Sequence, residues 1–218
     1  MAEFISAIAA DSAHALRRAE LLDGVLELAA TRGMEAVSVR EVAAQVGVSP
    51  AKVQYYFRTK DELLIAAFRH VEQLLDDRTA QVSYEHGVAT ALREVLVDWL
   101  PVDAVRARLV KVWIAFLARA VVTEALAAIE SAYQRRTQAQ LIGAIESGVE
   151  SGEYAPEVDP ALEARLLSAL VEGLSVRMLT DPAGLPADTA IATLDAHLAV
   201  HPRRANHRAP SHAQHRAY

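Results

Sequence analysis

The residues best suited to chemistry in this chain are a cationic and phenolic set formed by Lys52, Tyr55, Tyr56 and Lys60. In a helix, at about 100° per residue, Lys52 and the two tyrosines lie opposite the apolar residues of the segment and face outward. An ammonium group and two phenols on an outward face can contact the phosphates, sugars and thymine methyl groups of a duplex. Lys60 lies in the first turn of the following helix, where free backbone N–H groups favour a phosphate. The segment therefore predicts a DNA-contacting surface; the alternative is a solvated helix whose tyrosines pack on a neighbouring helix.

Two short helices joined by a tight turn are predicted to position these side chains. Ser38 is a good N-cap, and Glu41 completes a capping box with it. Gly47 is predicted to end the first helix, because glycine tolerates the left-handed conformation that follows a helix C-terminus. Ser49 then caps the second helix, with Pro50 at its first position. This is the helix-turn-helix pattern, in which the second helix enters the major groove of DNA.

The flanking segments complete a predicted DNA-binding domain at residues 13–59. An apolar stripe predicts a helix at about His14–Thr31 that packs behind the helix-turn-helix. A further capping box at Thr59 opens a longer helix, which we interpret as a link between this domain and the rest of the chain. Residues 1–12 have no strong periodic pattern, and we expect a flexible N-terminal arm there.

The composition favours an all-α protein. Hydrophobic residues make up 52% of the chain and aromatic residues only 6%, and strand-like alternation is absent. The absence of cysteine excludes a disulfide framework and a thiolate site, and agrees with the cytoplasm. The N-terminus lacks the basic start and apolar run of a secretory signal, so we expect a cytoplasmic protein without a membrane partner.

The charges are distributed unevenly, although the net charge is −6. Residues 38–60 contain four basic residues against Glu41 alone, whereas residues 71–200 contain 10 basic and 19 acidic residues. An acidic body would repel a duplex and help to orient the basic surface toward it.

Residues 60–200 are predicted to form a helical ligand-binding and dimerisation domain, with helices near residues 85–98, 101–120, 123–152, 160–180 and 187–200. A ligand cavity needs apolar walls and a few aimed polar groups. The candidates are the large or polar residues on otherwise apolar helices: Trp99, Trp113, Phe116, Tyr133, Glu172, Arg177 and Met178. For any single one of them, core packing or an ordinary ion pair is the alternative.

The last two helices are the most uniformly apolar pair, and we expect them to be antiparallel neighbours. We predict that they meet the same pair of a second chain in a four-helix bundle. The residues of this predicted dimer interface are Leu162, Leu166, Leu170, Leu174, Ile191, Leu194 and Leu198. A dimer would read two half-sites of a palindromic operator about 34 Å apart.

Residues 201–218 are basic and rich in histidine, with two prolines and no acidic residue. This composition predicts a disordered tail. It could add non-specific attraction to DNA or bind adventitious metal.

Residues 14–70 resemble the N-terminal domain of the TetR family of bacterial transcriptional regulators, through Gly33, Val39–Ala43, Gly47–Ser49, Tyr56–Phe57 and Lys60–Leu63. The resemblance implies a dimeric repressor that leaves DNA when a small molecule binds its helical body. It places these residues at DNA-contacting positions: Ser38, Arg40, Ser49, Ala51, Lys52, Tyr55, Tyr56 and Lys60. Family members often have tyrosine where this chain has Gln54, whose amide can still contact a phosphate or read adenine. The body resembles the BetI-like branch through Val112–Ala120 and Leu170–Leu174.

Two other function classes remain to be weighed. An enzyme needs a nucleophile, an acid–base pair or a metal cluster. The sequence has no cysteine, no His-Glu-x-x-His, no glycine-rich phosphate loop and no Gly-x-Ser-x-Gly, so we expect no catalysis, cofactor or metal. A helical protein-interaction scaffold would account for the body, but it leaves the cationic, tyrosine-bearing helix without a purpose.

Overall fold

The computed structural model describes the backbone of residues 2–199 and the side chains of residues 13–199. Over residues 2–199 the chain is helical without a strand, which confirms the predicted all-α class. The elements are α1 (Ala2–Arg32), η1 (Met34–Ala36), α2 (Val39–Val46), α3 (Pro50–Tyr56), α4 (Lys60–Thr79), α5 (Val88–Asp98), α6 (Ala104–Ala120), α7 (Glu124–Glu150), α8 (Pro160–Thr180) and α9 (Ala187–Leu198). The predicted tail, residues 201–218, lies outside this part of the chain.

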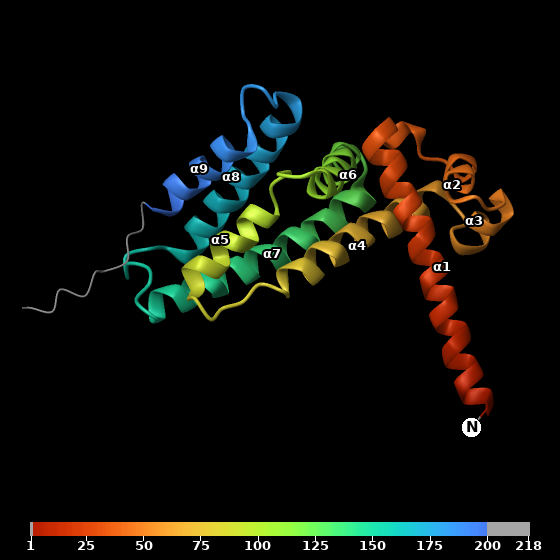
Figure 1. Cartoon of the computed structure of the whole chain (residues 1–218), viewed down its shortest axis with the longest axis horizontal. Coiled ribbons are helices and arrows are strands. Elements are labelled where there is room, and N and C mark those ends of the chain that lie inside the picture. Colours follow the sequence, from red (N-terminus) through yellow and green to blue (C-terminus); the bar gives the residue numbers. More distant parts are fainter. Residues whose placement is uncertain (1, 200–218) are drawn as a thin grey trace, which may run out of the picture.

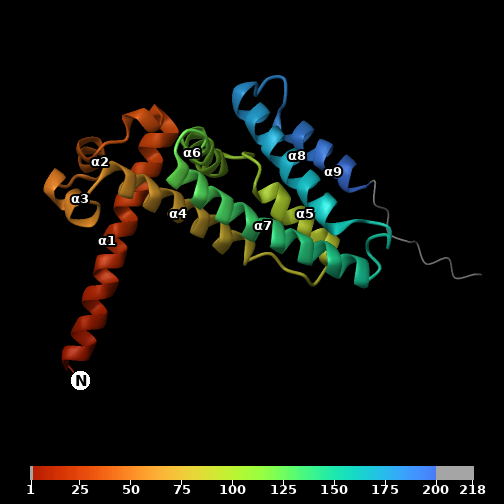
Figure 2. The same cartoon turned by 180° about the vertical axis from the view of Figure 1, so that it is seen from behind.

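The molecule is elongated, with α1, α2 and α3 at one end and α8 and α9 at the other (Figure 1). α4 runs from the helix-turn-helix end into the body, beside α7 (Figures 1 and 2). The N-terminal part of α1 projects away from the rest of the molecule (Figure 2). α4 therefore is the link between head and body that the sequence predicts.

The N-caps in the head form as predicted, but the glutamates of the two predicted capping boxes bond elsewhere: Glu41 accepts from Arg32, and Glu62 from the backbone N–H of Arg58. Ser38, Ser49 and Thr59 each accept a hydrogen bond from the backbone N–H three residues later, at 3.2, 3.2 and 3.0 Å respectively. Gly47 ends α2 in the left-handed region, with φ 72°, where a side chain would be strained. These local signals fix where α2, α3 and α4 begin, and so which way their side chains point.

Two helix starts differ from the prediction. α1 begins at Ala2, so the backbone of the expected arm at residues 1–12 is helical from that point. This segment is rich in alanine and contains neither glycine nor proline, so nothing in it interrupts a helix. α6 begins at Ala104 and not at Pro101, because the Asp103 side chain caps it by accepting a hydrogen bond from a first-turn N–H at 2.8 Å.

The core of the head is continuous with the body. Buried residues of α1, α2, α3 and α4 form one apolar cluster that also contains Leu109 and Val112 of α6. A second contact lies further along α4, where the Phe68 ring stacks on Phe116 of α6 with centroids 3.7 Å apart. The head is thus held by both α4 and α6, although the sequence had identified only the first of these links.

Candidate DNA interface and ligand cavity

α3 presents to solvent the face that its residue spacing predicts. Val53 and Phe57 are 0% and 1% exposed, whereas Tyr55 is 70% exposed. Lys52 is also exposed, and its Nζ lies 5.5 Å from the ring centroids of both Tyr55 and Tyr56. Lys52 and Tyr55 therefore face outward as predicted, whereas Tyr56 is half-buried and packs against the head core.

The other predicted DNA-contacting residues lie on the same end of the molecule. Ser38 is half-buried, and its oxygen accepts a capping hydrogen bond, which leaves its O–H free to donate. Among the side chains of residues 13–199, Arg40, Lys52 and Lys60 form no ion pair, so their charges remain available to a ligand. The exposed members of the set are Arg40, Ser49, Ala51, Lys52, Gln54, Tyr55 and Lys60.

His14 of α1 belongs to the same surface, although sequence reasoning missed it. Its ring centroid lies 4.6 Å from that of Tyr56 and 6.1 Å from that of Tyr55. The two tyrosine rings in turn meet edge to face at 5.1 Å. No pattern in the sequence links a histidine of α1 to α3, because only the packing of the two helices brings them together. We define His14, Lys52, Tyr55 and Tyr56 as the aromatic–cationic surface.

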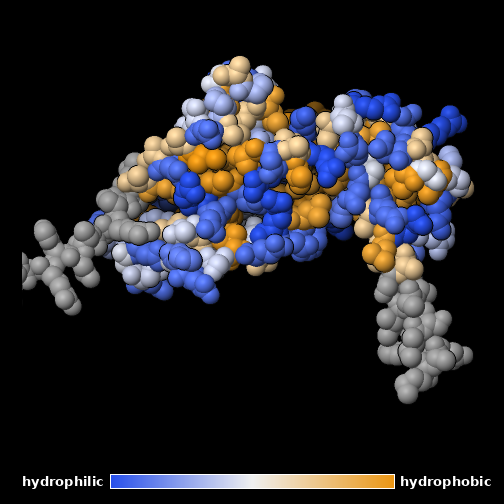
Figure 3. All heavy atoms as spheres, in the orientation of Figure 1, coloured by the Kyte–Doolittle hydropathy of each residue, from blue (hydrophilic) through white to orange (hydrophobic). Residues whose placement is uncertain are grey.

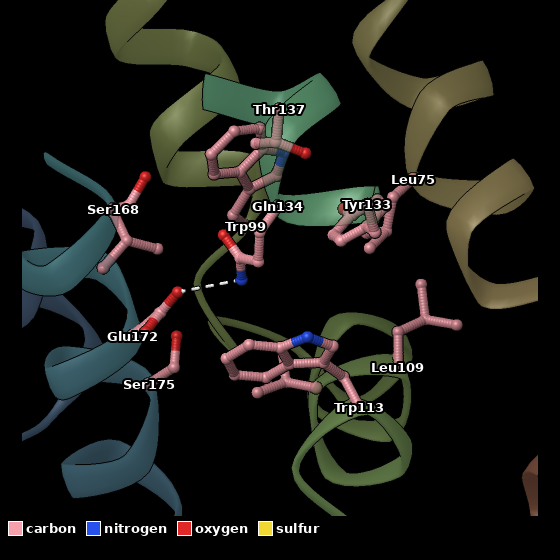
Figure 4. A pocket seen from close by; sticks show the side chains of 12 residues that line it. Leu75, Trp99, Leu109, Trp113, Tyr133, Gln134, Thr137, Ser168, Glu172 and Ser175 are labelled. Atoms are coloured by element: carbon pink, nitrogen blue, oxygen red, sulfur yellow. Dashed lines mark hydrogen bonds between the residues drawn. The ribbon is translucent and has the colours of Figure 1, made fainter. Parts of the chain in front are cut away.

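A cavity lies in the body between α4, α6, α7, α8 and the end of α5 (Figure 4). Its empty space, including the opening to solvent, is about 600 Å³, of which about 70 Å³ can hold the centres of water-sized groups. The Trp99 and Trp113 indoles lie on opposite sides of it, and Glu172 and Gln134 meet between them (Figure 4). The lining residues are Leu75, Trp99, Leu109, Val110, Trp113, Tyr133, Gln134, Thr137, Ser168, Val171, Glu172 and Ser175.

Two carboxyl groups share one amide at this cavity. Gln134 Nε2 donates to Glu130 Oε1 at 3.0 Å and to Glu172 Oε1 at 3.3 Å. Glu130 is only 9% exposed, and its Oε2 has no hydrogen-bond partner among the described residues. Burial raises the pKa of Glu130, and the Glu172 charge raises it further, against the opposing effects of Gln134 and Trp113. Burial also raises the pKa of Glu172.

Tyr133 closes the side of the cavity that faces α4. Burial raises the pKa of its phenol to about 12, with Thr137 opposing the shift, so the group is neutral and can donate a hydrogen bond. Its ring meets Phe68 of α4 edge to face, with centroids 6.0 Å apart. A ligand that displaces Tyr133 would therefore press on α4.

Residues 88–202 match the family described as BetI-type transcriptional repressor, C-terminal, and residues 21–67 match bacterial regulatory proteins, tetR family. The first match covers more than half of the chain. The chain belongs to the TetR family. It is a DNA-binding transcriptional regulator with a helix-turn-helix head and a BetI-type body.

The curated relatives of this TetR-family regulator are transcriptional regulators, and the similarity extends over most of their length. It is 28% identical to PksA of Bacillus subtilis, over 78% of this chain and 82% of that protein. It is 27% identical to BetI of Brucella anthropi, over 85% of this chain and 93% of that protein.

Solved structures agree with this assignment. A transcriptional regulator from Rhodococcus sp. Rha1 is 31% identical and superposes with a TM-score of 0.75, over 84% of this chain and 94% of that one. A putative transcriptional regulator from Saccharomonospora viridis, in complex with choline, is 23% identical with a TM-score of 0.73, over 84% of this chain and 96% of that one. At that identity the second comparison supports the fold alone.

Four of the seven ligand-pocket residues predicted from the sequence line the cavity of this TetR-family regulator. Trp99, Trp113, Tyr133 and Glu172 line it. Phe116 is instead buried against Phe68 of α4, Met178 is 6% exposed in the core of the body, and Arg177 is exposed and pairs with Asp181. Periodicity could not separate these residues from the lining, because each lies on a broadly apolar helix.

Several lining residues were missed. The polar ones are Gln134 and Thr137 on α7 and Ser168 and Ser175 on α8. Together with the predicted Tyr133 and Glu172, they mark one face of each helix. This spacing was a usable signal. In the sequence alone, these polar residues are also consistent with a solvent-exposed helix face, and only the positions of the neighbouring helices show that they line a cavity.

The predicted dimer residues fall into three groups in the structure. Leu174 and Leu194 are 7% and 0% exposed, because they pack in the core formed by α5, α7, α8 and α9. Leu162 and Leu166 are 49% and 46% exposed. Leu170, Ile191 and Leu198 are half-buried. Hydrophobic atoms are visible over α8 in Figure 3. The exposed group is open to a second chain, and half-buried Leu170 lines a surface groove on the same helix.

Residues 2–199 contain no helix long and apolar enough to cross a membrane. Among the side chains of residues 13–199, no cluster of histidine and acidic residues could hold a metal ion.

Replacing Glu130 with glutamine is expected to stabilise the ligand-free protein at neutral pH. Because the folded pKa lies above the ordinary value, Glu130 is protonated in both the folded and unfolded states at low pH and costs nothing there. As the pH rises above about 4.5, the unfolded chain ionises first and the wild type loses stability relative to the variant. We expect a melting temperature about 2–4 °C higher than that of the wild type at pH 8, corresponding to about 1 kcal/mol.

The measurement is thermal unfolding of both proteins between about pH 4 and pH 8. Glu146→Gln, at an exposed site on the same helix, is the matched control and should follow the wild type. A Glu130→Gln curve that lies below the wild-type curve at pH 8 would show that the ionised carboxylate is satisfied in the fold.

Proposed function

We propose that this TetR-family regulator is a homodimeric repressor that leaves a palindromic operator when a small molecule occupies the cavity. The observation that carries the proposal is the course of α4. This helix begins at exposed Lys60, beside the aromatic–cationic surface, and its Leu75 lines the cavity. A single helix therefore connects the two sites, and a small tilt at one end would displace the other.

α6 supplies a second mechanical connection. Leu109 lies in the head core and also lines the cavity, and Trp113 lies one turn further along the same helix. A ligand in the cavity thus touches two helices that support the head. In a dimer, a tilt of each head would change the spacing between the two recognition helices, which must match successive major grooves.

The DNA contacts are proposed to be of two kinds. Lys60, Ser38 and Tyr55 or Tyr56 position the protein on phosphates, whereas Arg40 and Lys52 reach base edges. Ala51 and Ser49 lie at the start of α3, where close approach to bases is possible, and exposed Gln54 can donate to a phosphate or read adenine.

The names of the relatives, PksA and BetI, support regulation of transcription and leave the effector open. We propose that the protein acts in the cytoplasm, where a bacterial operator lies, and that it has no enzymatic activity. The rival proposal is a helical scaffold that binds another protein without reading DNA.

Selection of bound sequences from a random DNA pool by the full-length protein tests the proposal. The expected product is an inverted repeat, and light scattering should give the mass of a dimer at micromolar concentration. Recovery of unrelated sequences with no enrichment would favour the scaffold. The mass of a monomer at micromolar concentration would overturn the homodimer.

Lys60→Ala is expected to weaken binding to all sequences alike, because the residue would contact phosphate and not bases. The slope of log K against log salt should flatten by about one unit. The measurement is a salt titration of binding to operator and to random DNA. Lys111→Ala, at an exposed lysine on α6, is the control and should leave the slope unchanged; a loss confined to operator DNA would instead make Lys60 a base reader.

A further inference from the structure

Three helices of the body meet at one carboxylate. Asp98, at the C-terminal end of α5, accepts hydrogen bonds from Arg78 of α4 at 2.5 and 2.7 Å and from Arg106 of α6 at 2.9 Å. α4 and α6 are also the two helices that hold the head. We propose that Asp98 is a positioning residue for operator recognition, which fixes the angle of the head and so sets the half-site spacing that the dimer accepts. The inference rests on the proposed homodimer, because only a dimer reads two half-sites.

The geometry of these contacts restricts direction as well as distance. Two nitrogens of the Arg78 guanidinium meet the two oxygens of Asp98 side by side, which is the bidentate arrangement with the highest geometric specificity. Asp103 holds the Arg106 guanidinium in place with a further contact at 3.0 Å. The side chains of Asp98 and Arg106 are 16% and 26% exposed, so water and salt screen this contact less than a fully exposed ion pair. We define Arg78, Asp98 and Arg106 as the Asp98 network.

The two arginines keep Asp98 ionised. Burial raises the pKa of its carboxyl group, but the hydrogen bonds from Arg78 and Arg106 outweigh burial and hold the pKa below its ordinary value. The carboxylate therefore carries its charge at neutral pH. Removing this charge would leave two partly buried guanidinium groups without the partner that they share, so the contact between α4 and α6 would loosen.

The Asp98 network lies at the end of α4 that is remote from the head. Among the side chains of residues 13–199, the ion pairs that join α4 to the body are Arg78–Asp98 and Asp76–Arg136, and both are in the last turn of the helix. The other end of α4 packs into the head core. The 20 residues of α4 span about 30 Å, so a tilt of about 6° about the anchored end moves the head by about 3 Å, the length of one base pair.

The network also borders the cavity. Trp99 follows Asp98 directly, and the lining residues Leu75 and Leu109 each lie three residues from an arginine of the network, on α4 and α6 respectively. Residues three apart in a helix are neighbours on its surface. A movement of these three walls would therefore reach the head through Asp98.

A second ion pair of α5 provides a matched control. Arg93 forms the same kind of bidentate pair with Asp195 of α9, at 2.5 and 2.9 Å. Among the described residues, the apolar cluster of the head contains none from α9. Asp195→Asn therefore removes an equivalent contact from the same helix without releasing α4 or α6, whereas Asp98→Asn releases both.

The first experiment measures operator spacing with the full-length proteins. The DNA probes are the inverted repeat selected from the random pool, the same repeat with one or two base pairs added or removed between its halves, and a single half-site. The wild type and Asp195→Asn should bind the selected spacing about ten-fold more tightly than the altered spacings. In Asp98→Asn this preference should fall to about three-fold or less, while the affinity for the single half-site stays unchanged because the head is intact.

The second experiment measures the position of the heads without DNA. The chain has no cysteine, so Gln45→Cys, at an exposed position of α2, places a single spin label on each head. The distribution of distances between the two labels of a dimer should be broader in Asp98→Asn than in the wild type or Asp195→Asn. Equally narrow distributions in all three proteins would overturn the inference.

The spacing measurement separates this inference from the proposed function. A wild-type spacing preference that Asp98→Asn retains would overturn the role of Asp98 and leave the homodimer standing. Equal losses of affinity at every spacing and at the single half-site would also overturn it, because a purely structural role lowers all affinities alike. A wild type without any spacing preference would overturn the homodimeric reading of two half-sites, and the role of Asp98 with it.

Discussion

Leu166→Glu is expected to convert the protein to a monomer and to lower its affinity for operator DNA about a hundred-fold or more. Leu162, Leu166 and Val176 are 49%, 46% and 41% exposed on α8, and a groove beside them is formed with α9 by residues that include Gly173 and Thr193. In a two-fold symmetric interface the same surface of both chains takes part, so each substitution occurs twice in the interface. Burying two carboxylates there without partners would be strongly unfavourable.

The loss of operator affinity follows from symmetry. A monomer contacts one half-site, so it lacks the second set of contacts that the dimer makes without a separate binding event. Sedimentation or light scattering gives the mass, and a titration of labelled operator gives the affinity. Val121→Glu is the matched control, because Val121 is 84% exposed in the turn after α6, away from α8. If the Leu166→Glu protein remains a dimer, the interface does not include this part of α8.

Lys52→Ala and Arg40→Ala are expected to relax discrimination at particular base pairs, at a cost of about 1–3 kcal/mol for each half-site. Both side chains are exposed and unpaired within residues 13–199, on the helices that the head presents outward. A palindromic operator contains each contact twice, so the effect on total affinity is doubled.

The measurement compares each variant on the selected operator, on operators with single base-pair changes and on random DNA. At a base pair that one of these residues reads, the wild type should bind the changed operator more weakly than the original operator. The variant that lacks this residue should bind the two operators equally. Lys111→Ala serves as the charge-matched control. Equal losses on operator and random DNA for Lys52→Ala, Arg40→Ala and Lys60→Ala alike would mean that none of them reads bases.

The head could be predicted in detail because its signals are local. Ser38, Ser49 and Thr59 cap their helices from a few residues away, and Gly47 occupies a conformation that few other residues adopt. Once these boundaries are fixed, helical spacing alone places Val53 inside and Tyr55 outside. His14 could not be predicted as part of this surface, because its contacts with Tyr55 and Tyr56 depend on the packing of α1 against α3.

The body was harder to predict because α8 is apolar on more than one side. Leu166 and Leu167 are adjacent in sequence, yet the first is 46% exposed and the second 0%. Periodicity shows that both sides are apolar, but only the positions of α7 and α9 decide which one is buried. The cavity was missed in part for a related reason, since Gln134 and Ser168 look like surface residues until α6 covers them.

The position of Leu109 restricts how this protein could evolve toward new effectors. Because this side chain belongs to the head core as well as to the cavity, a substitution that reshapes that wall would also destabilise the DNA-binding head. Ser168 and Ser175, on α8, contribute to the opposite wall and to no part of the head core. Substitutions that change effector preference should therefore accumulate on α8, because they can alter the cavity there without changing the head that binds the operator.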